Sequence, residues 1–331
     1  MSRISFWLNN ARYVSLGQSL LPAFVALCLA IDQPSFSWIY ALLGILGVAL
    51  AHLSFNLFDD YFDYKKNGPG IRNEIANSGM RARIGKCEYI VSGEATPRQL
   101  FYVASFFGMA AMAVGIIVLS ARGWPIALIV GITALLGISY AGDPLRLSYR
   151  GLGEITIAII FGPLLMSGIY YAACGTFTPA LWFLSIPIGL LAANILYTHD
   201  VMDYEADKKI DKRTLCVVTG NQKINLVFSA LFIFIPYILI LSGIITGYLS
   251  KWFFFIFLTL PQAVSLWYLL TQFVKYPYKE FPRRWWMGPM EKWNDIRSAG
   301  IDWFMIRWYL SRNLVILFCV IIIIIALAGG L

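Results

Sequence analysis

Long hydrophobic stretches follow one another along almost the whole chain, separated by polar segments. There are about nine of them, and each is near the ~20 residues that a helix needs to cross the hydrocarbon core of a bilayer. Within them, apolar and polar residues do not alternate as they would in the strands of a membrane barrel. We therefore predict an all-α integral membrane bundle of about nine transmembrane helices, forming a single domain over residues 1–331. The stretches lie near residues 14–32, 36–58, 98–120, 124–141, 152–174, 179–199, 223–247, 252–274 and 308–330.

The composition and the distribution of charge agree with this architecture and orient it. Hydrophobic residues make up 59% of the chain and charged residues 13%, whereas a soluble domain carries about 25% charged residues. With the N-terminus on the cytoplasmic side, only Arg122 and Lys251 of the 26 Lys and Arg fall on the outer side. This bias is typical of cytoplasmic loops. We expect a multi-pass protein of the cell membrane in contact with the lipid bilayer, and no nucleic-acid partner, because no basic patch stands apart from the membrane.

Residues 275–307 form a long polar segment between the last two hydrophobic stretches. Its tryptophans, which include Trp285 and Trp286, alternate with Arg and Lys. Indole rings at the headgroup level and cations in the polar layer are typical of an interfacial segment. We predict a cytoplasmic membrane-surface anchor; a role in holding substrate is the alternative.

Aspartates gather at the inner ends of the second and sixth predicted helices, in residues 56–67 and 199–214. Helical positions three, four and seven apart share a face, so each cluster is expected to line one face of its helix. The two faces carry Asn56, Asp60 and Asp63 in the first cluster and Asp200, Asp203 and Asp207 in the second.

Carboxylates crowded in this way repel one another and cost desolvation energy near a membrane, so a cation must compensate them. Oxygen ligands suit Mg²⁺, which usually shares its coordination shell between carboxylates and substrate phosphates. The clusters therefore predict a site for Mg²⁺ and a diphosphate, with solvated helix ends as the alternative. Polar residues such as His52, Asn194 and His199 precede the clusters inside the stretches, which indicates a polar interior or cavity. His52 by itself is better explained as a satisfied interior histidine than as a catalyst.

The two clusters resemble the aspartate-rich motifs of the UbiA superfamily of intramembrane prenyltransferases, NDxxDxxxD and DxxDxxxD. Asp60 and Asp63 match the central aspartates of the first motif, and residues 200–207 match the second in full, with KRTL following at 212–215. In the first motif, however, Asp59 replaces the leading Asn, and the last Asp is absent.

The stretch 139–171 resembles the branch of the superfamily that prenylates dihydroxynaphthoate in menaquinone synthesis. Its specific parts are YRGLGE at 149–154 and FGP at 161–163. Asn56 fits the NxxxD form of that branch, whereas the position of the missing Asp is taken by Asn67 or Gly70, before an unusual insert.

The resemblance implies Mg²⁺-dependent transfer of a polyprenyl group from an allylic polyprenyl diphosphate to an aromatic acceptor. It implies that five aspartates are catalytic and hold the metal: Asp60, Asp63, Asp200, Asp203 and Asp207. Substrate-binding roles are expected for Asn56, Lys86, Tyr140, Arg146, Arg150, Asn194 and Lys212, with cations for the diphosphate and an aromatic face for the allylic cation. Asp200 or Asp203 would take the proton of the acceptor.

Three alternatives stay open at this point. A prenyltransferase of this kind would accept another aromatic compound through the same motifs. A UbiA-like terpene cyclase would ionise the same diphosphate without an acceptor. A membrane transporter would use the acidic residues as an ion pathway.

Overall fold

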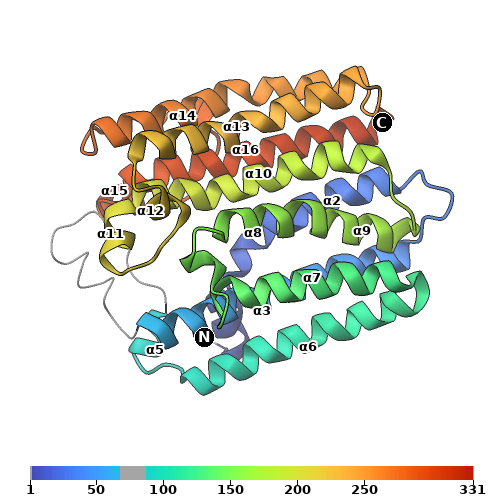
Figure 1. The fold of residues 1–331 in the computed structure, drawn as a ribbon, viewed down its shortest axis with the longest axis horizontal. Coiled ribbons are helices and arrows are strands. Elements are labelled where there is room, and N and C mark those ends of the chain that lie inside the picture. Colours follow the sequence, from blue (N-terminus) through green and yellow to red (C-terminus); the bar gives the residue numbers. More distant parts are fainter. Residues whose placement is uncertain (1, 68–86, 331) are drawn as a thin grey trace.

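Helices form nearly all the regular structure of the protein in a computed structural model, which describes residues 2–67 and 87–330 (Figure 1). Within these ranges, nine helical segments are long and apolar enough to cross a membrane, which confirms the predicted all-α membrane bundle. The segments are α2 (Gly17–Ala30) with the turn before it, α3 (Trp38–Asn67), α6 (Pro97–Arg122), α7 (Trp124–Ala141), α8 (Gly153–Ile159) continued by α9 (Leu165–Cys174), α10 (Pro179–Met202), α13 (Gln222–Ile245), α14 (Leu260–Lys275) with the 3₁₀ helix Lys251–Thr259 before it, and α16 (Asp302–Leu327).

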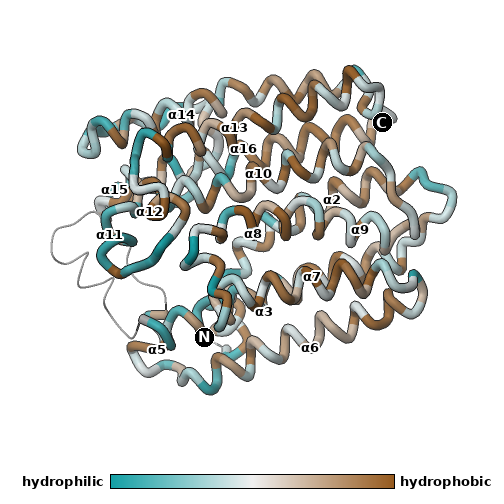
Figure 2. The backbone as a smooth tube through the Cα atoms, in the orientation of Figure 1, coloured by the Kyte–Doolittle hydropathy of each residue, from teal (hydrophilic) through white to brown (hydrophobic). Residues whose placement is uncertain are grey.

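Short helices gather at one end of the bundle, on the left in Figure 1. Figure 2 shows that hydrophilic segments are concentrated around α11 and α12 at this end, whereas hydrophobic residues follow the long helices. Because α3 and α10 both end there, the two acidic clusters lie at the same end of the molecule. The short helices are α5 (Glu88–Val91), α11 (Tyr204–Lys209), α12 (Leu215–Thr219) and α15 (Trp293–Ser298), and α1 (Arg3–Asn10) begins the described chain.

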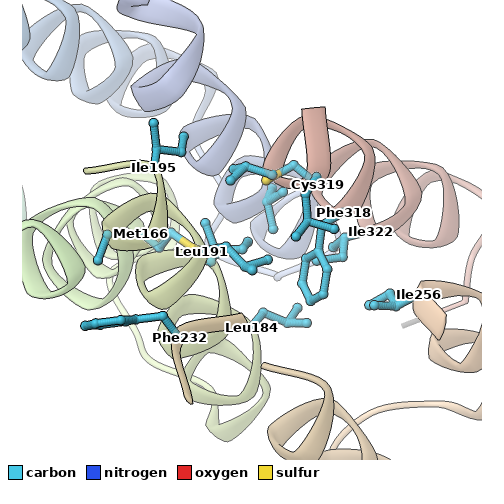
Figure 3. Close-up of a cluster of buried hydrophobic side chains, with 14 of the residues drawn as sticks. Met166, Leu184, Leu191, Ile195, Phe232, Ile256, Phe318, Cys319 and Ile322 are labelled. Atoms are coloured by element: carbon cyan, nitrogen blue, oxygen red, sulfur yellow. The ribbon is translucent and has the colours of Figure 1, made fainter. Parts of the chain in front are cut away.

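The main hydrophobic core lies around α10, which packs against α13, α16 and α8. In α10, 67% of the most apolar stretch is buried, against 17% in both α6 and α7. Figure 3 shows side chains of this core, among them Leu184 and Leu191 of α10 and Phe318 of α16. The bundle is thus closely packed on the α10 side, whereas α6 and α7 are covered by little other protein.

A π-helical turn (Ile160–Leu164), which contains Pro163, joins α8 to α9 where this span meets α10. Gly162 and Gly189 face each other across the contact: a Cβ at Gly189 would lie 2.2 Å from the carbonyl oxygen of Ala158. Small residues allow such close approach of helix backbones in membranes. The contact fixes the position of α10, and with it the second acidic cluster.

Helix α3 and helix α16 extend beyond the stretches that hydropathy marks. Helix α3 continues to Asn67, through the first acidic cluster, and α16 begins at Asp302 rather than near residue 308. The physical reason is that hydropathy reports contact with lipid or core, whereas backbone hydrogen bonds continue the helix into the polar layer.

We predict that Gly189→Ala lowers the stability of the protein by about 1–3 kcal/mol, because overpacking forces the backbones apart. The measurement is thermal unfolding of the purified protein in detergent. Gly131→Ala in α7 is the matched control, since a Cβ there meets nothing within 4 Å. Equal melting temperatures for the two variants would contradict the role of this contact.

Candidate active site

A cavity of about 860 Å³ lies inside the bundle, and its lining includes residues of α2, α3, α6, α7, α9, α10 and α16. Glycines and the side chains of Ala, Val, Ile and Met form much of its wall on α3, α6, α7 and α9. Carboxylates line its other part: Asp59, Asp63, Asp200, Asp203 and Asp207. The cavity therefore joins a long apolar space to a group of acidic side chains.

In the first cluster, Asp60 is buried behind the cavity wall. The guanidinium of Arg12 donates to its Oδ1, and the hydroxyl of Tyr89 donates to its Oδ2 at 3.2 Å. Arg12 also lies 3.6 Å from the carboxylate of Asp59, at Nη1 and Oδ2. Arg12 itself lines the cavity and adopts the left-handed backbone conformation (φ 57°).

The charges of this cluster affect the two groups that bind Asp60. Burial alone would lower the pKa of Arg12, but the carboxylates of Asp60 and Asp59 outweigh it and raise that pKa. Burial, and then the charge of Asp60, raises the pKa of the Tyr89 hydroxyl. Arg12 therefore stays cationic and Tyr89 stays a hydrogen-bond donor over the physiological range.

Asp63 lies one helical turn beyond Asp60 and faces the cavity. Its Oδ1 accepts a hydrogen bond of 2.8 Å from the hydroxyl of Tyr149. The ammonium of Lys66 lies 3.4 Å from the centre of the Tyr149 ring, a cation–π contact. The YRGLGE segment that begins at Tyr149 is thereby attached to the first cluster.

In the second cluster, three aspartates are almost fully buried, yet all line the cavity: Asp200, Asp203 and Asp207. They do not lie on one uninterrupted helix, because the regular helix breaks at Asp203, between α10 and α11. Hydrogen bonds four residues apart continue on both sides of the break, from Asp203 N to His199 O at 2.7 Å and from Asp207 N to Asp203 O at 2.8 Å. The three side chains consequently still reach the same space.

Glu154, a buried residue that the sequence analysis did not select, lies beside the second cluster. Its Oε1 accepts a hydrogen bond of 3.2 Å from the backbone N–H of Leu215, at the start of α12. Burial, and then the carboxylates of Asp200 and Glu154, raise the pKa of the nearby Cys216 thiol. The signal for Glu154 was its place in YRGLGE, where a carboxylate follows two glycines.

Three of the predicted substrate-binding residues line the cavity. They are Asn56, Tyr140 and Lys212. The Nδ2 of Asn56 donates to the carbonyl oxygen of Ala11 at 3.0 Å, so it also holds the segment that carries Arg12. The backbone N–H of Lys212 donates to Asp207 O at 2.9 Å, which places this lysine at the second cluster.

Three other predicted binding residues, Arg146, Arg150 and Asn194, are not among the described residues that line the cavity. Arg146 pairs with Asp143 at 2.7 Å, and Arg150 donates to the carbonyl oxygen of Pro144 at 3.1 Å. The Nδ2 of Asn194 donates to Ser311 of α16 at 3.1 Å. Lys86 lies outside the described residues.

His52 is engaged on both ring nitrogens, as expected of a satisfied interior histidine. Its Nε2 lies 2.9 Å from the hydroxyl of Ser15, and its Nδ1 lies 2.6 Å from that of Ser19. These contacts attach α3 to α2 and to the turn that precedes it. Arg12 is a further residue of the site that the sequence analysis did not select, because its partners Asp59 and Asp60 are distant along the chain.

The five aspartates that line the cavity fit a hard divalent cation in kind, since such ions take carboxylate oxygens as ligands. Over residues 2–67 and 87–330, however, no three His, Cys, Asp or Glu side chains converge closely enough to form a metal-binding group.

The fold and the site together define an integral membrane enzyme with an acid-lined cavity. The sequence profile of the UbiA prenyltransferase family matches residues 19–294, and the chain belongs to this family. It is therefore a prenyltransferase, and the transporter alternative falls away.

Individual relatives are similar over much of the chain. The 1,4-dihydroxy-2-naphthoate octaprenyltransferase of Bacillus subtilis is 25% identical over 256 residues, 76% of this chain and 77% of that protein. The 2-carboxy-1,4-naphthoquinone phytyltransferase of Synechocystis is 27% identical over 198 residues, 59% of this chain and 64% of that protein. Among solved structures, a UbiA homolog from Archaeoglobus fulgidus bound to GPP and Mg²⁺ has a TM-score of 0.60 at 19% identity, covering 93% of this chain and 99% of that one.

We predict that the Arg12–Asp60 pair is energetically coupled. Arg12→Met alone leaves a buried carboxylate without its cation, so the double variant with Asp60→Asn loses less stability than the two single variants together. The expected coupling is about 0.5–3 kcal/mol in thermal or denaturant unfolding. The exposed pair of Arg146 and Asp143 is the control, with an expected coupling of about 0.2–1 kcal/mol. Additive effects at Arg12 and Asp60 would disprove the coupling.

Proposed function

We propose that this prenyltransferase transfers a polyprenyl group from an allylic diphosphate to an aromatic acceptor, 1,4-dihydroxy-2-naphthoate, in menaquinone synthesis. The observation that carries the proposal is the single cavity that aspartates of both clusters share with a long apolar wall. An allylic polyprenyl diphosphate has the matching two parts, a charged head and an apolar tail. The acceptor rests on the resemblance of residues 139–171 and on the names of the Bacillus and Synechocystis relatives.

In this proposal, the carboxylates of Asp63, Asp200, Asp203 and Asp207 would hold Mg²⁺ together with the diphosphate. Bound Mg²⁺ supplies charge neutralisation for the leaving diphosphate. Asp60 would belong to this set if the Arg12 guanidinium bound the diphosphate instead of its carboxylate. The Arg12 guanidinium suits that role, because its planar donor fork matches phosphate oxygens.

Further residues of the chain bind and orient the substrates. Lys212 faces the cavity beside Asp207 and contacts the diphosphate, while Tyr140 offers its ring to the allylic cation. Asn56 holds the segment of Arg12 in place. Either Asp200 or Asp203 accepts the proton that the acceptor ring loses.

Three described residues of the predicted binding set remain part of the proposal without lining the cavity. Arg146 and Arg150 would bind the diphosphate from the loop after α7, and Lys86, which lies outside the described residues, stays in the proposed set as a further cation. Asn194 lies at the contact of α10 with α16, where its side chain donates a hydrogen bond to Ser311.

We also propose that the N-terminus and the acidic end face the cytoplasm in the cell membrane, as the distribution of Lys and Arg favours. In one continuous domain, residues 275–307 then form the membrane-surface anchor. Trp285 is 90% exposed there, while the carbonyl oxygen of Trp286 accepts a hydrogen bond of 2.9 Å from Gln262 of α14. The segment is thus attached to the bundle and still presents an indole ring outward.

The test is a reaction in membranes that contain the protein, Mg²⁺, a labelled polyprenyl diphosphate and 1,4-dihydroxy-2-naphthoate. The expected product is a prenylated naphthoate-derived lipid, absent when EDTA removes the metal. Diphosphate release without this product would discard the acceptor and indicate another aromatic compound or a cyclase reaction. Matched assays with 4-hydroxybenzoate separate these two outcomes.

We predict that Asp63→Asn and Asp203→Asn each lower kcat by about 10²–10³, because each removes charge that holds the metal beside the diphosphate. Asp32→Asn is the control: this aspartate follows α2, away from the acidic end, and does not line the cavity. The measurement is initial rate per amount of correctly inserted protein. Wild-type rates in the Asp63 or Asp203 variant would remove that residue from the site.

A further inference from the structure

One corner of the cavity is aromatic and comes from α10 and α16. His199, Phe304, Met305 and Trp308 line the cavity there. The ring centre of His199 lies 5.2 Å from that of Phe304 and 6.2 Å from that of Trp308. None of these four residues belongs to either aspartate motif. Three of them lie about 100 positions beyond the second motif.

The corner is held firmly by the helix that carries it. Position 308 lies on the same face of α16 as positions 304 and 305, from which it is separated by four and three residues. Phe304 is buried and backed by the ring of Trp303, 5.6 Å away and nearly perpendicular. The guanidinium of Arg312 lies 5.5 Å from the Trp308 ring centre, one turn further along. The rings are therefore fixed by packing around them, which favours binding without a large ordering cost.

The chemistry of this corner differs from that of the rest of the wall. Aliphatic side chains and glycines of α3, α6, α7 and α9 suit a flexible isoprenoid tail. A planar aromatic ring gains more from stacked or edge-to-face contacts with other rings. An imidazole adds a hydrogen-bonding group for a ring hydroxyl, which a tail does not carry.

The corner also lies where an acceptor would have to be. His199 directly precedes Asp200 in α10, and both residues line the cavity with Asp203. A ring held against His199 therefore lies next to the carboxylates that are proposed to bind the diphosphate. Its reacting carbon would face the allylic carbon of the donor, as transfer requires.

We infer that His199, Phe304 and Trp308 form the subsite that binds the aromatic ring of the acceptor. This inference rests on the proposed function and assigns the acceptor to a particular wall of the same cavity. Phe304 and Trp308 pack against the planar ring, and His199 hydrogen-bonds its hydroxyl group. The donor tail occupies the aliphatic wall opposite.

The experiment compares the kinetics of Trp308→Ala with those of Trp308→Phe, which keeps a ring, and of Trp182→Ala. Trp182 is a half-exposed residue of α10 that does not line the cavity. We expect Trp308→Ala to raise the KM for 1,4-dihydroxy-2-naphthoate about three- to tenfold, with the KM for the diphosphate unchanged. Trp308→Phe recovers most of the loss, and Trp182→Ala matches the wild type.

Binding measured without turnover provides a second readout. The probe is 1-hydroxy-2-naphthoate, and its dissociation constant in the presence of Mg²⁺ and an unreactive diphosphate analogue should rise by the same factor in Trp308→Ala. An unchanged KM and dissociation constant would overturn the subsite. A lower kcat with unchanged acceptor KM would also overturn it, because the rings would then act on the allylic cation.

The wild-type protein keeps this failure separate from that of the proposed function. If the wild type prenylates the naphthoate but Trp308→Ala behaves identically, the subsite alone is wrong. If the wild type consumes diphosphate without prenylating any naphthoate, the proposed acceptor is wrong, and the subsite for it falls as well.

Discussion

The carboxylates at the end of an apolar bundle impose the constraint on which the rest of the site depends. Buried acidic side chains are costly unless cations or hydrogen-bond donors compensate them. In the first cluster, Arg12 and Tyr89 compensate Asp60, and Tyr149 donates to Asp63. The protein brings these partners together from the N-terminal segment, from α5 and from the 3₁₀ turn Leu147–Tyr149. The loops and the helices at this end are therefore arranged so that buried carboxylates have cationic or hydrogen-bonding partners.

The same constraint explains why the helices of the bundle are packed unevenly. The region around α10 is closely packed, and glycine contacts such as Gly162 with Gly189 fix the second cluster. Helices α6 and α7 are much less enclosed and form part of the cavity wall. The closely packed half thus positions the acidic groups, and the less enclosed helices α6 and α7 bound the space for an apolar substrate. Such a division is consistent with a reaction that needs precise placement at the head and tolerance along the tail.

Much of the fold could be predicted from the sequence, because hydropathy directly reports which segments contact lipid. The extent of α3 through its acidic cluster could not, since polar residues continue a helix beyond the hydrocarbon layer. At the site, helical spacing predicts one common face for Asp200 and Asp207, and both line one cavity although the helix breaks between them. The partners could not be predicted, because Arg12 reaches Asp60 across 48 positions of the chain. The ring corner at His199 likewise depends on how α16 packs against α10, which no local pattern encodes.

The central claim is that the carboxylates of this cavity bind a divalent cation together with a diphosphate. Electron paramagnetic resonance of the purified protein with Mn²⁺, a paramagnetic substitute for Mg²⁺, tests it most directly. Titrations would be made with and without geranyl diphosphate, a donor short enough to handle in detergent. Weak Mn²⁺ binding that becomes tight only when the diphosphate is present is the predicted result. Equally weak binding in both titrations, or tight binding unaffected by the diphosphate, would contradict the claim.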